Sequence, residues 1–472
     1  MDDTLAGRLA SFAHACRDDH VPSDVASSVR SRILDILGIS VAASGLDTSR
    51  AVVGFIADQG GSPQAGVIGS GTRWPAAWAA MANGVFAHSL DYDDTHLPSV
   101  LHPSAAVVPA GLAVAERRGS DGLALIDAIA VGVETTIRVG MAGFDLSTRQ
   151  STFFEHGQHA TSICGTIGAA VTAGLLSGLE PDGIVDAIGI AASMSSGVIE
   201  GNRTGGTVKR MHCGWAAHAG VVAASLAAAG ITGPPTALEG RFGLFEAFLH
   251  GRFDAEAVTD GLGERWELPG VFFKPYPANH FTHAAADAAL DLRSRGLDPA
   301  TVERVRVGVA SATVRTIGQP IEVKRRPATG YQAQFSGPYV VAAALLGGSG
   351  LGLSLDDFTD ELATDPQRRA LMDRISIEGD ERCDAIYPYQ FPAVVEVTTM
   401  DGTKLSSEVL VNRGGTERPL SRDELALKFR SNVAPRLQPG IVDEVIDLCD
   451  NLDGSVSAAA LVSTINEGFI RP

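Results

Sequence analysis

The segment Ile163–Leu179, ICGTIGAAVTAGLLSGL, is apolar on nearly all faces of the helix that it predicts. Such a helix lies inside a bundle, because it has no polar side to present to water. Gly165, Gly168, Ala169 and Gly174 would let neighbouring helices approach closely. The segment therefore predicts a core in which helices pack on helices.

The same pattern of apolar residues at helical spacing extends over the first half of the chain. Ser23 can cap a helix in which apolar residues recur at every fourth position from Val25 to Val41, and Gly45 ends it. Further helices are expected near residues 75–90, 104–118, 121–140, 160–178, 181–195 and 212–230.

The pattern changes near residue 270. Val305, Val307 and Val309 alternate with other residues, which indicates a strand, and residues 395–399 and 405–411 flank an Asp401-Gly402 turn that is typical of a hairpin. After residue 415 the chain becomes helical again, beginning with a capping box of Ser421 and Glu424. We therefore predict a mainly α protein with a large all-helical domain, 1–269 and 415–472, and a smaller α+β domain, 270–414, inserted before the C-terminal helices.

Composition narrows the function classes. The 472 residues include 37 Lys and Arg against 55 Asp and Glu, a net charge of −18, which argues against nucleic acid as a partner. The five cysteines are dispersed and form no CxxC pair, so no zinc or iron–sulfur motif is present, and no phosphate-binding loop occurs. The acidic N-terminus and the weakly hydrophobic apolar stretches favour a cytoplasmic protein without a membrane span. We expect no cofactor and no metal.

Ten of the twelve histidines lie between His88 and His283, in clusters with other reactive groups. The densest cluster runs from His88 to Ser104 between two expected helices and contains Asp91, Thr95 and His102. It is consistent with a solvated acidic loop, and equally with a catalytic loop held by rigid helices.

Three further clusters follow. His159 precedes the apolar helix, whose N-terminus would attract a carboxylate; Lys209 and Arg210 precede an alanine-rich helix; Lys274 lies at the domain junction. Each has an ordinary explanation, as a cap, a solvated basic pair or a stiff linker. Together they supply carboxylates, imidazoles and lysines, the groups for proton transfer on an anionic substrate.

These clusters also resemble a known family. LDYDDT at residues 90–95 with His102-Pro103-Ser104 resembles the signature of the MmgE/PrpD family, which includes 2-methylcitrate dehydratase, cis-aconitate decarboxylase and iminodisuccinate epimerase. Three more motifs match in order over essentially the whole chain: residues 157–168, 209–214 and 274–278. The resemblance implies a helical domain with an α+β lid, a homodimer and a pocket between the domains.

Carried over by position, the resemblance implies site residues on both sides of that pocket. The catalytic residues would be Asp91, His102, His159 and Lys209, and the substrate-binding residues Thr95, Arg210 and Lys274. Decarboxylase members have a histidine after the Pro-Ala pair, where this chain has Asn279 followed by His280.

The resemblance implies a carbanion next to a carboxylate. Lys209 would stabilise the developing charge, and one of Asp91, His102 and His159 would remove the proton. The first expectation is a hydro-lyase similar to 2-methylcitrate dehydratase, acting on a small di- or tricarboxylate. A carboxy-lyase similar to cis-aconitate decarboxylase and an epimerase are the alternatives.

Two other classes remain open. One is a metal-dependent hydrolase, whose ligands would come from the set His88, Asp91, Asp93, Asp94 and His96. The other is a helical binding protein without catalysis, against which the clustered histidines and lysines argue.

Overall fold

The apolar segment is the helix α8 (Ala160–Leu176), and it is buried along its whole length. In this computed structural model, which describes residues 3–201 and 205–470, α8 packs against α6 (Gly122–Met141) and α11 (Val208–Ala228), and α11 packs against α4 (Ala76–His88). The other long helices around them are α1 (Leu5–Asp19), α2 (Ser23–Ala43), α3 (Asp47–Gln59), α5 (Ser104–Arg118), α9 (Pro181–Met194), α23 (Pro439–Asp450) and α24 (Ala459–Glu467). The helices expected from the sequence are confirmed in this half of the chain.

Glycines bring the central helices together. A Cβ atom on Gly84 of α4 would lie 2.8 Å from the Cα atom of Gly214 on α11, and one on Gly168 of α8 would lie 2.3 Å from the carbonyl oxygen of Gly132 on α6. A methyl group at either position would force the helices apart. The expectation of close helix packing is confirmed at Gly168.

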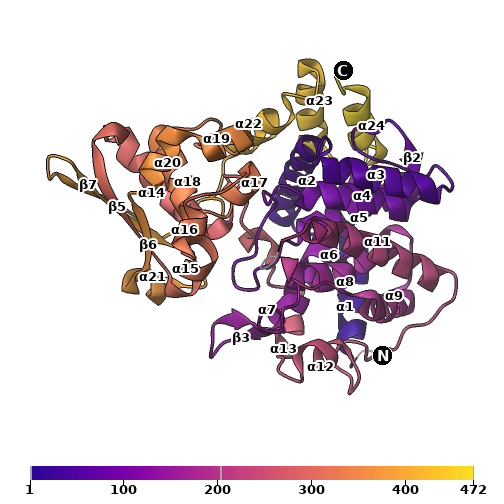
Figure 1. Cartoon of the computed structure of the whole chain (residues 1–472). Coiled ribbons are helices and arrows are strands. Elements are labelled where there is room, and N and C mark those ends of the chain that lie inside the picture. Colours follow the sequence, from indigo (N-terminus) through magenta and orange to yellow (C-terminus); the bar gives the residue numbers. More distant parts are fainter. Residues whose placement is uncertain (1–2, 202–204, 471–472) are drawn as a thin grey trace. The chain divides into compact units, whose positions relative to one another are not determined.

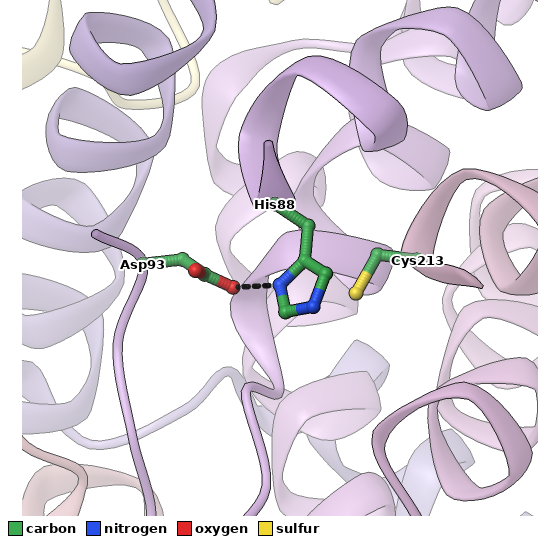
Figure 2. A group of neighbouring side chains, drawn as sticks. All are labelled: His88, Asp93 and Cys213. Atoms are coloured by element: carbon green, nitrogen blue, oxygen red, sulfur yellow. Dashed lines mark hydrogen bonds and ion pairs between the residues drawn. The ribbon is translucent and has the colours of Figure 1, made fainter. Parts of the chain in front are cut away.

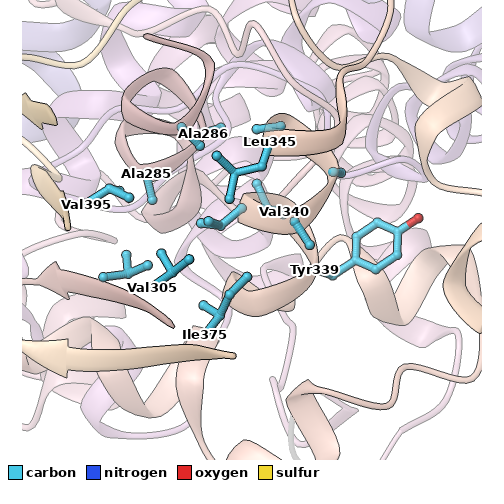
Figure 3. Close-up of a cluster of buried hydrophobic side chains, with 14 of the residues drawn as sticks. Ala285, Ala286, Val305, Tyr339, Val340, Leu345, Ile375 and Val395 are labelled. Atoms are coloured by element: carbon cyan, nitrogen blue, oxygen red, sulfur yellow. The ribbon is translucent and has the colours of Figure 1, made fainter. Parts of the chain in front are cut away.

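A four-stranded sheet organises the region after residue 300. The strand order is β6 (Ile375–Gly379), β5 (Val302–Val309), β7 (Ala393–Thr399) and β8 (Lys404–Val409), with β5 parallel to β6 and the other pairs antiparallel. The helices α14 (His283–Ser294) and α18 (Gly337–Leu346) pack on it. Figure 3 shows members of their shared core: Ala285, Ala286, Val305, Val340, Leu345, Ile375 and Val395. The expected hairpin is confirmed.

The chain divides into two units (Figure 1). Of the described residues, those within Met1–Ser89, Asp93–Val271 and Asn432–Pro472 form the helical unit, and those within Leu90–Tyr92 and Phe272–Ser431 form the mixed unit. The protein is mainly α.

The unit boundaries differ from the expected ones in three places, the smallest being Gly270 and Val271, which belong to the helical unit rather than to the mixed unit. Residues 415–431, expected in the helical domain, lie in the mixed unit, and so does the short segment Leu90–Tyr92. Helix α22 (Arg422–Val433) begins in the mixed unit and its last two residues belong to the helical unit. The capping box therefore marks where a helix begins, but not where the chain changes unit.

Within the described ranges, no single helix is long and apolar enough to cross a membrane. By length and composition alone, α2 and α3 would qualify only as a pair, and they meet at an angle of 93°.

Candidate active site

Four histidines of the helical unit lie close together, and two of them, His88 and His102, approach the carboxylate of Asp93. His88 ends α4, and its Nδ1 lies 2.7 Å from Asp93 Oδ2, while His102 Nδ1 lies 3.7 Å from the same oxygen. The ring of His88 lies 5.1 Å from that of His102 and 5.7 Å from that of His159, and His159 lies 4.9 Å from His212, measured between ring centroids. We call these four residues with Asp93 the histidine cluster.

Local structure fixes the orientation of His102. Its Nδ1 donates to the backbone oxygen of Asp94 at 2.7 Å, and its backbone N–H donates to Thr161 Oγ1 at 3.2 Å. Because Nδ1 carries the proton, Nε2 of the neutral ring is the nitrogen that can accept another. The side chain of His102 retains 11% exposure, so this ring lies at the open edge of the cluster.

Asp94 has a structural role. Its carboxylate accepts from Arg32 Nη1 at 2.7 Å and from Ser104 Oγ at 2.5 Å, and Arg32 also donates to the backbone oxygens of Leu268 and Val271. Burial raises the pKa of Asp94 and lowers that of Arg32, although each favours the charge of the other. The pair ties the loop after α4 to α2.

Burial and nearby charge keep two of the rings neutral. The pKa of His159 lies well below the ordinary value of 6.5, first because the ring is buried and then because of His88, Lys209, His212 and His102. Burial first, and then His88 and Lys209, lower the pKa of His212 to about 4. The two Nδ1 atoms lie 2.9 Å apart, which requires one ring to donate and the other to accept.

Lys209 supplies the positive charge. The helix α11 begins at Val208, four residues earlier than expected, so Lys209 lies in its first turn and on the same face as His212 and Cys213. A cation there opposes the helix dipole. A charge kept in an unfavourable place, beside buried imidazoles, is typical of a binding or catalytic site.

The two remaining site residues predicted in the helical unit, Thr95 and Arg210, lie in different surroundings. Thr95 is buried, and its Oγ1 has no hydrogen-bond partner among the described residues. Arg210 donates from Nη1 to Thr48 Oγ1 at 3.3 Å, which places it against α3.

Asp91 and Lys274 meet in the mixed unit. Lys274 Nζ donates to the backbone oxygen of Asp91 at 2.7 Å and lies 3.3 Å from Oδ2, and both side chains are buried. Lys428 Nζ donates to the backbone oxygen of Tyr92 at 3.1 Å and lies 3.8 Å from the centre of its ring. These lysines fasten the segment 90–92 to the mixed unit. That Asp91 and Lys274 share a pocket with the histidine cluster remains a prediction.

The position after the Pro-Ala pair has a capping function here. Asn279 Oδ1 accepts from the backbone N–H of Phe281 at 3.1 Å and so caps the short helix His280–Thr282. His280 is buried against His283, with ring centroids 4.6 Å apart. His283 Nε2 lies 3.0 Å from the backbone oxygen of Ala278, and burial lowers its pKa to about 3.

Three of the five residues of the metal-hydrolase alternative have partners outside that set. Asp94 binds Arg32, Asp91 binds Lys274, and His96 Nδ1 lies 2.6 Å from Ser99 Oγ. The pair of His88 and Asp93 stays together within the histidine cluster. Sequence reasoning did not assign His88, Asp93 or His212 to the proton-transfer site, although the spacing of Lys209 and His212 places them on one helical face.

Comparison with known proteins gives the class. Residues 7–256 match the MmgE/PrpD N-terminal domain and residues 276–453 match the MmgE/PrpD C-terminal domain. The chain belongs to the MmgE/PrpD family.

The relatives to which the chain is similar catalyse two kinds of reaction, decarboxylation and dehydration. The chain is 29% identical to cis-aconitate decarboxylase of Mus musculus, over 96% of this chain and 91% of the relative, and 29% identical to that of Homo sapiens, over 100% and 96%. It is 27% identical to the mitochondrial 2-methylcitrate dehydratase of Yarrowia lipolytica over 38% of this chain and 35% of the relative. Decarboxylases and dehydratases are both lyases.

Proposed function

We propose that the protein is a cofactor-independent lyase that acts on a small di- or tricarboxylate through a carbanion next to a carboxylate group. The observation that carries the proposal is the histidine cluster, in which buried imidazoles are kept neutral beside the ammonium group of Lys209. Neutral imidazoles can accept a proton, and a lysine can bind the substrate anion.

The electrostatics suit that chemistry. Removing a proton or carbon dioxide next to a carboxylate leaves an electron pair beside an existing negative charge, so the barrier falls when a fixed cation faces the new charge. Lys209 takes this role in our proposal, and the hydroxyl group of Thr95 is a donor for a substrate oxygen. His102 and His159 are the candidates for proton donor and acceptor.

Decarboxylation is the first candidate reaction. In that reaction a C–C bond breaks, carbon dioxide leaves, and its electron pair stays on carbon until an acid delivers a proton. The similarity to cis-aconitate decarboxylases extends over nearly the whole chain, whereas the similarity to the dehydratase covers 38% of it. We therefore place a carboxy-lyase acting on a cis-aconitate-like substrate before the hydro-lyase that the sequence first suggested.

Dehydration and epimerisation also begin with removal of a proton next to a carboxylate, so they need the same base and the same cation. The family resemblance implies that Asn279 stands where decarboxylase members have a histidine, and an amide cannot act as a proton donor in acid–base catalysis. A protein that lacks that acid would have to use His102 or His159 for both transfers, or would stop after exchanging the proton.

An assay in deuterium oxide separates the three reactions. The full chain is incubated with cis-aconitate, 2-methylcitrate and related di- and tricarboxylates, and NMR follows substrate and product. Decarboxylation gives a product with one new C–D bond, dehydration gives an alkene that keeps every carbon, and epimerisation gives the epimer of the substrate with deuterium at the inverted carbon.

A pair of variants provides the control. His159→Gln should lower turnover by about 10²–10⁴-fold, and His250→Gln, at an exposed histidine of the same unit, should leave it nearly unchanged. If no carboxylate loses carbon dioxide, loses water or exchanges its proton, the proposal is wrong.

A further inference from the structure

Two rings of the histidine cluster are bound through Nδ1 to oxygen atoms. His88 Nδ1 lies 2.7 Å from the carboxylate of Asp93, and Figure 2 shows Asp93 on that side of the ring and Cys213 on the side of Nε2. His102 Nδ1 donates to the backbone oxygen of Asp94 at 2.7 Å. An ionised carboxylate and a carbonyl oxygen only accept hydrogen bonds, so each neutral ring carries its proton on Nδ1. Neither ring can then offer an Nε2–H group as a proton donor.

His159 and His212 are bound to each other instead. Their Nδ1 atoms lie 2.9 Å apart. Only one of two neutral rings can have its proton at that contact, because two N–H groups would repel and two lone pairs would make no bond. The other ring of the pair therefore carries its proton on Nε2. Of the four rings in their neutral forms, it is the one that has an Nε2–H group.

We propose that His212 is the donor in this pair, so that its Nδ1–H group gives His159 the tautomer with a proton on Nε2 and makes His159 the acid of the reaction. His102, whose Nε2 can accept a proton, is then the base. This inference rests on the proposed function, in which one of these two rings donates a proton and the other accepts one. His212 is a positioning residue, because it acts on the substrate only through His159.

The surroundings of His159 suit an acid that is neutral before it reacts. When Nε2–H gives its proton to the carbanion, the N–H bond breaks, a C–H bond forms, and the negative charge moves from carbon to the ring until water returns a proton. Burial first, and then nearby charges that include Lys209, lower the pKa of the imidazolium form of His159. The same cation favours the anionic ring, and so does the N-terminus of α8, which directly follows His159. Neutral imidazole serves as a hydrogen-bond donor in catalysis under similar conditions.

The helices hold the two rings together. The backbone oxygen of His212, on α11, accepts from Ser162 Oγ in the first turn of α8 at 3.2 Å. Further along the same crossing, a Cβ on Gly220 would lie 2.6 Å from the Cβ of Ala169. Both rings are buried. The contact between His159 and His212 is therefore set by two closely packed helices.

Nitrogen-15 NMR of the histidine-labelled full chain tests the tautomer without any substrate. At neutral pH, couplings to the ring C–H groups identify which nitrogen carries the proton, and the spectra of His159→Gln and His212→Asn assign the two rings by their missing signals. We expect His159 to be protonated at Nε2 and His212 at Nδ1. The reverse arrangement would overturn the inference.

Two replacements of similar size test the effect on turnover. His212→Asn places an amide N–H group near the position of Nδ1–H, so it can still donate to His159, whereas His212→Leu cannot. Once a substrate is known, His212→Leu should lower kcat at least about tenfold with little change in KM, because the tautomer is no longer fixed. His212→Asn should recover most of that loss. Equal kcat values in the two variants, both folded by circular dichroism, would contradict the positioning role.

The two measurements separate this inference from the proposed function. If a carboxylate is turned over but His159 is protonated at Nδ1, the proposed function stands and this inference is wrong. If no carboxylate reacts, the proposed function is wrong, and the catalytic role of the tautomer is wrong with it.

Discussion

The helical unit and the mixed unit hold their polar groups in opposite ways. In the helical unit, burial lowers the pKa values of His159 and His212, so that the rings are neutral. The positive charge of Lys209, at the start of a helix, lowers these pKa values further because it disfavours a second positive charge. In the mixed unit, Lys274 and Asp91 are buried as an ion pair. The first arrangement keeps the rings neutral, and the second keeps charges fixed.

The two units also differ in how their cores are built. Glycine and alanine at helix crossings bring polar side chains of different helices together in the helical unit, while in the mixed unit β-branched residues of the sheet pack against alanine-rich helices in an apolar core. We infer that proton transfer belongs to the helical unit and that the mixed unit contributes rigidity and charge. Five experiments test this division.

The largest effect is expected on turnover. Replacing His102 or His159 by Ala should lower turnover at saturating substrate by about 10²–10⁴-fold, because the acid or base is lost. Lys209→Ala should chiefly weaken binding of the anion and lower kcat/KM. Steady-state kinetics check both, and nearly normal turnover in all three variants would remove catalysis from the histidine cluster.

The next effect concerns the ion pair of the mixed unit. Asp91→Asn leaves the Lys274 charge without its carboxylate partner, and should lower the free energy of unfolding by about 3 kcal/mol. Asparagine suits the position, where Asp91 has a φ of 50°.

Urea unfolding followed by circular dichroism measures that cost. The control is Asp291→Ala, which breaks the exposed pair with Arg295 and should cost no more than about 0.5 kcal/mol. Equal losses of unfolding free energy in the two variants would show that the buried ion pair stabilises the protein no more than the exposed one.

Acid should destabilise both units. Burial lowers the pKa of His96, in the helical unit, to about 4 and that of His283, in the mixed unit, to about 3. Both rings are neutral above pH 6.5, where this contribution to stability is complete; below it the unfolded chain binds protons that the folded chain does not. Each histidine therefore removes up to about 1.4 kcal/mol per pH unit from pH 6.5 downward, to about pH 4 for His96.

Thermal unfolding from pH 8 to pH 4 measures this slope. His283→Gln should flatten it for the transition of the mixed unit and leave that of the helical unit unchanged. A melting temperature that does not fall between pH 6.5 and pH 5 would contradict the buried neutral state of these rings.

Much of the architecture could be predicted because it depends on local pattern. The helical period predicted α2, and the glycine-rich apolar segment predicted α8. The Asp401-Gly402 turn with its flanking valines predicted the hairpin. The unit boundary near residue 431 could not be predicted, because α22 continues through it and no turn or change of composition marks it.

The site was predictable only where residues share an element. Lys209 and His212 are three residues apart on one helix, whereas His88 meets His159 only because α4, α11 and α8 pack closely. The partners of the carboxylates could not be read from the loop itself, since Asp94 binds Arg32 from 62 residues away and Asp91 binds Lys274 from 183 residues away. The lowered pKa values of the histidines follow from their burial, which cannot be read from the sequence.

A smaller effect tests the helix crossing that brings α4 to α11. Gly84→Ala places a methyl group 2.8 Å from Gly214 Cα, and should lower the free energy of unfolding by about 1–3 kcal/mol. Gly54→Ala is the matched control, because a Cβ there meets nothing within 4 Å; it should stabilise the helix by about 0.5–1 kcal/mol. Chemical unfolding compares the two, and a neutral Gly84→Ala would mean that the helices can separate at no cost.

The smallest effect is a change of protonation on ligand binding. Propane-1,2,3-tricarboxylate, a tricarboxylate without a double bond or hydroxyl group, should raise the pKa of His159, because an anion nearby favours the imidazolium. NMR of histidine-labelled protein follows the ring signals against pH, with His156, which stacks on His250, as the internal control that should not move. Lys209→Ala should raise the pKa of His159 without ligand, since one of the charges that lower it is gone, and should require more ligand for the same shift. If the His159 signal is unchanged at saturating ligand, the anion binds elsewhere, and the neutral cluster of the helical unit is a feature of its packing rather than of its chemistry.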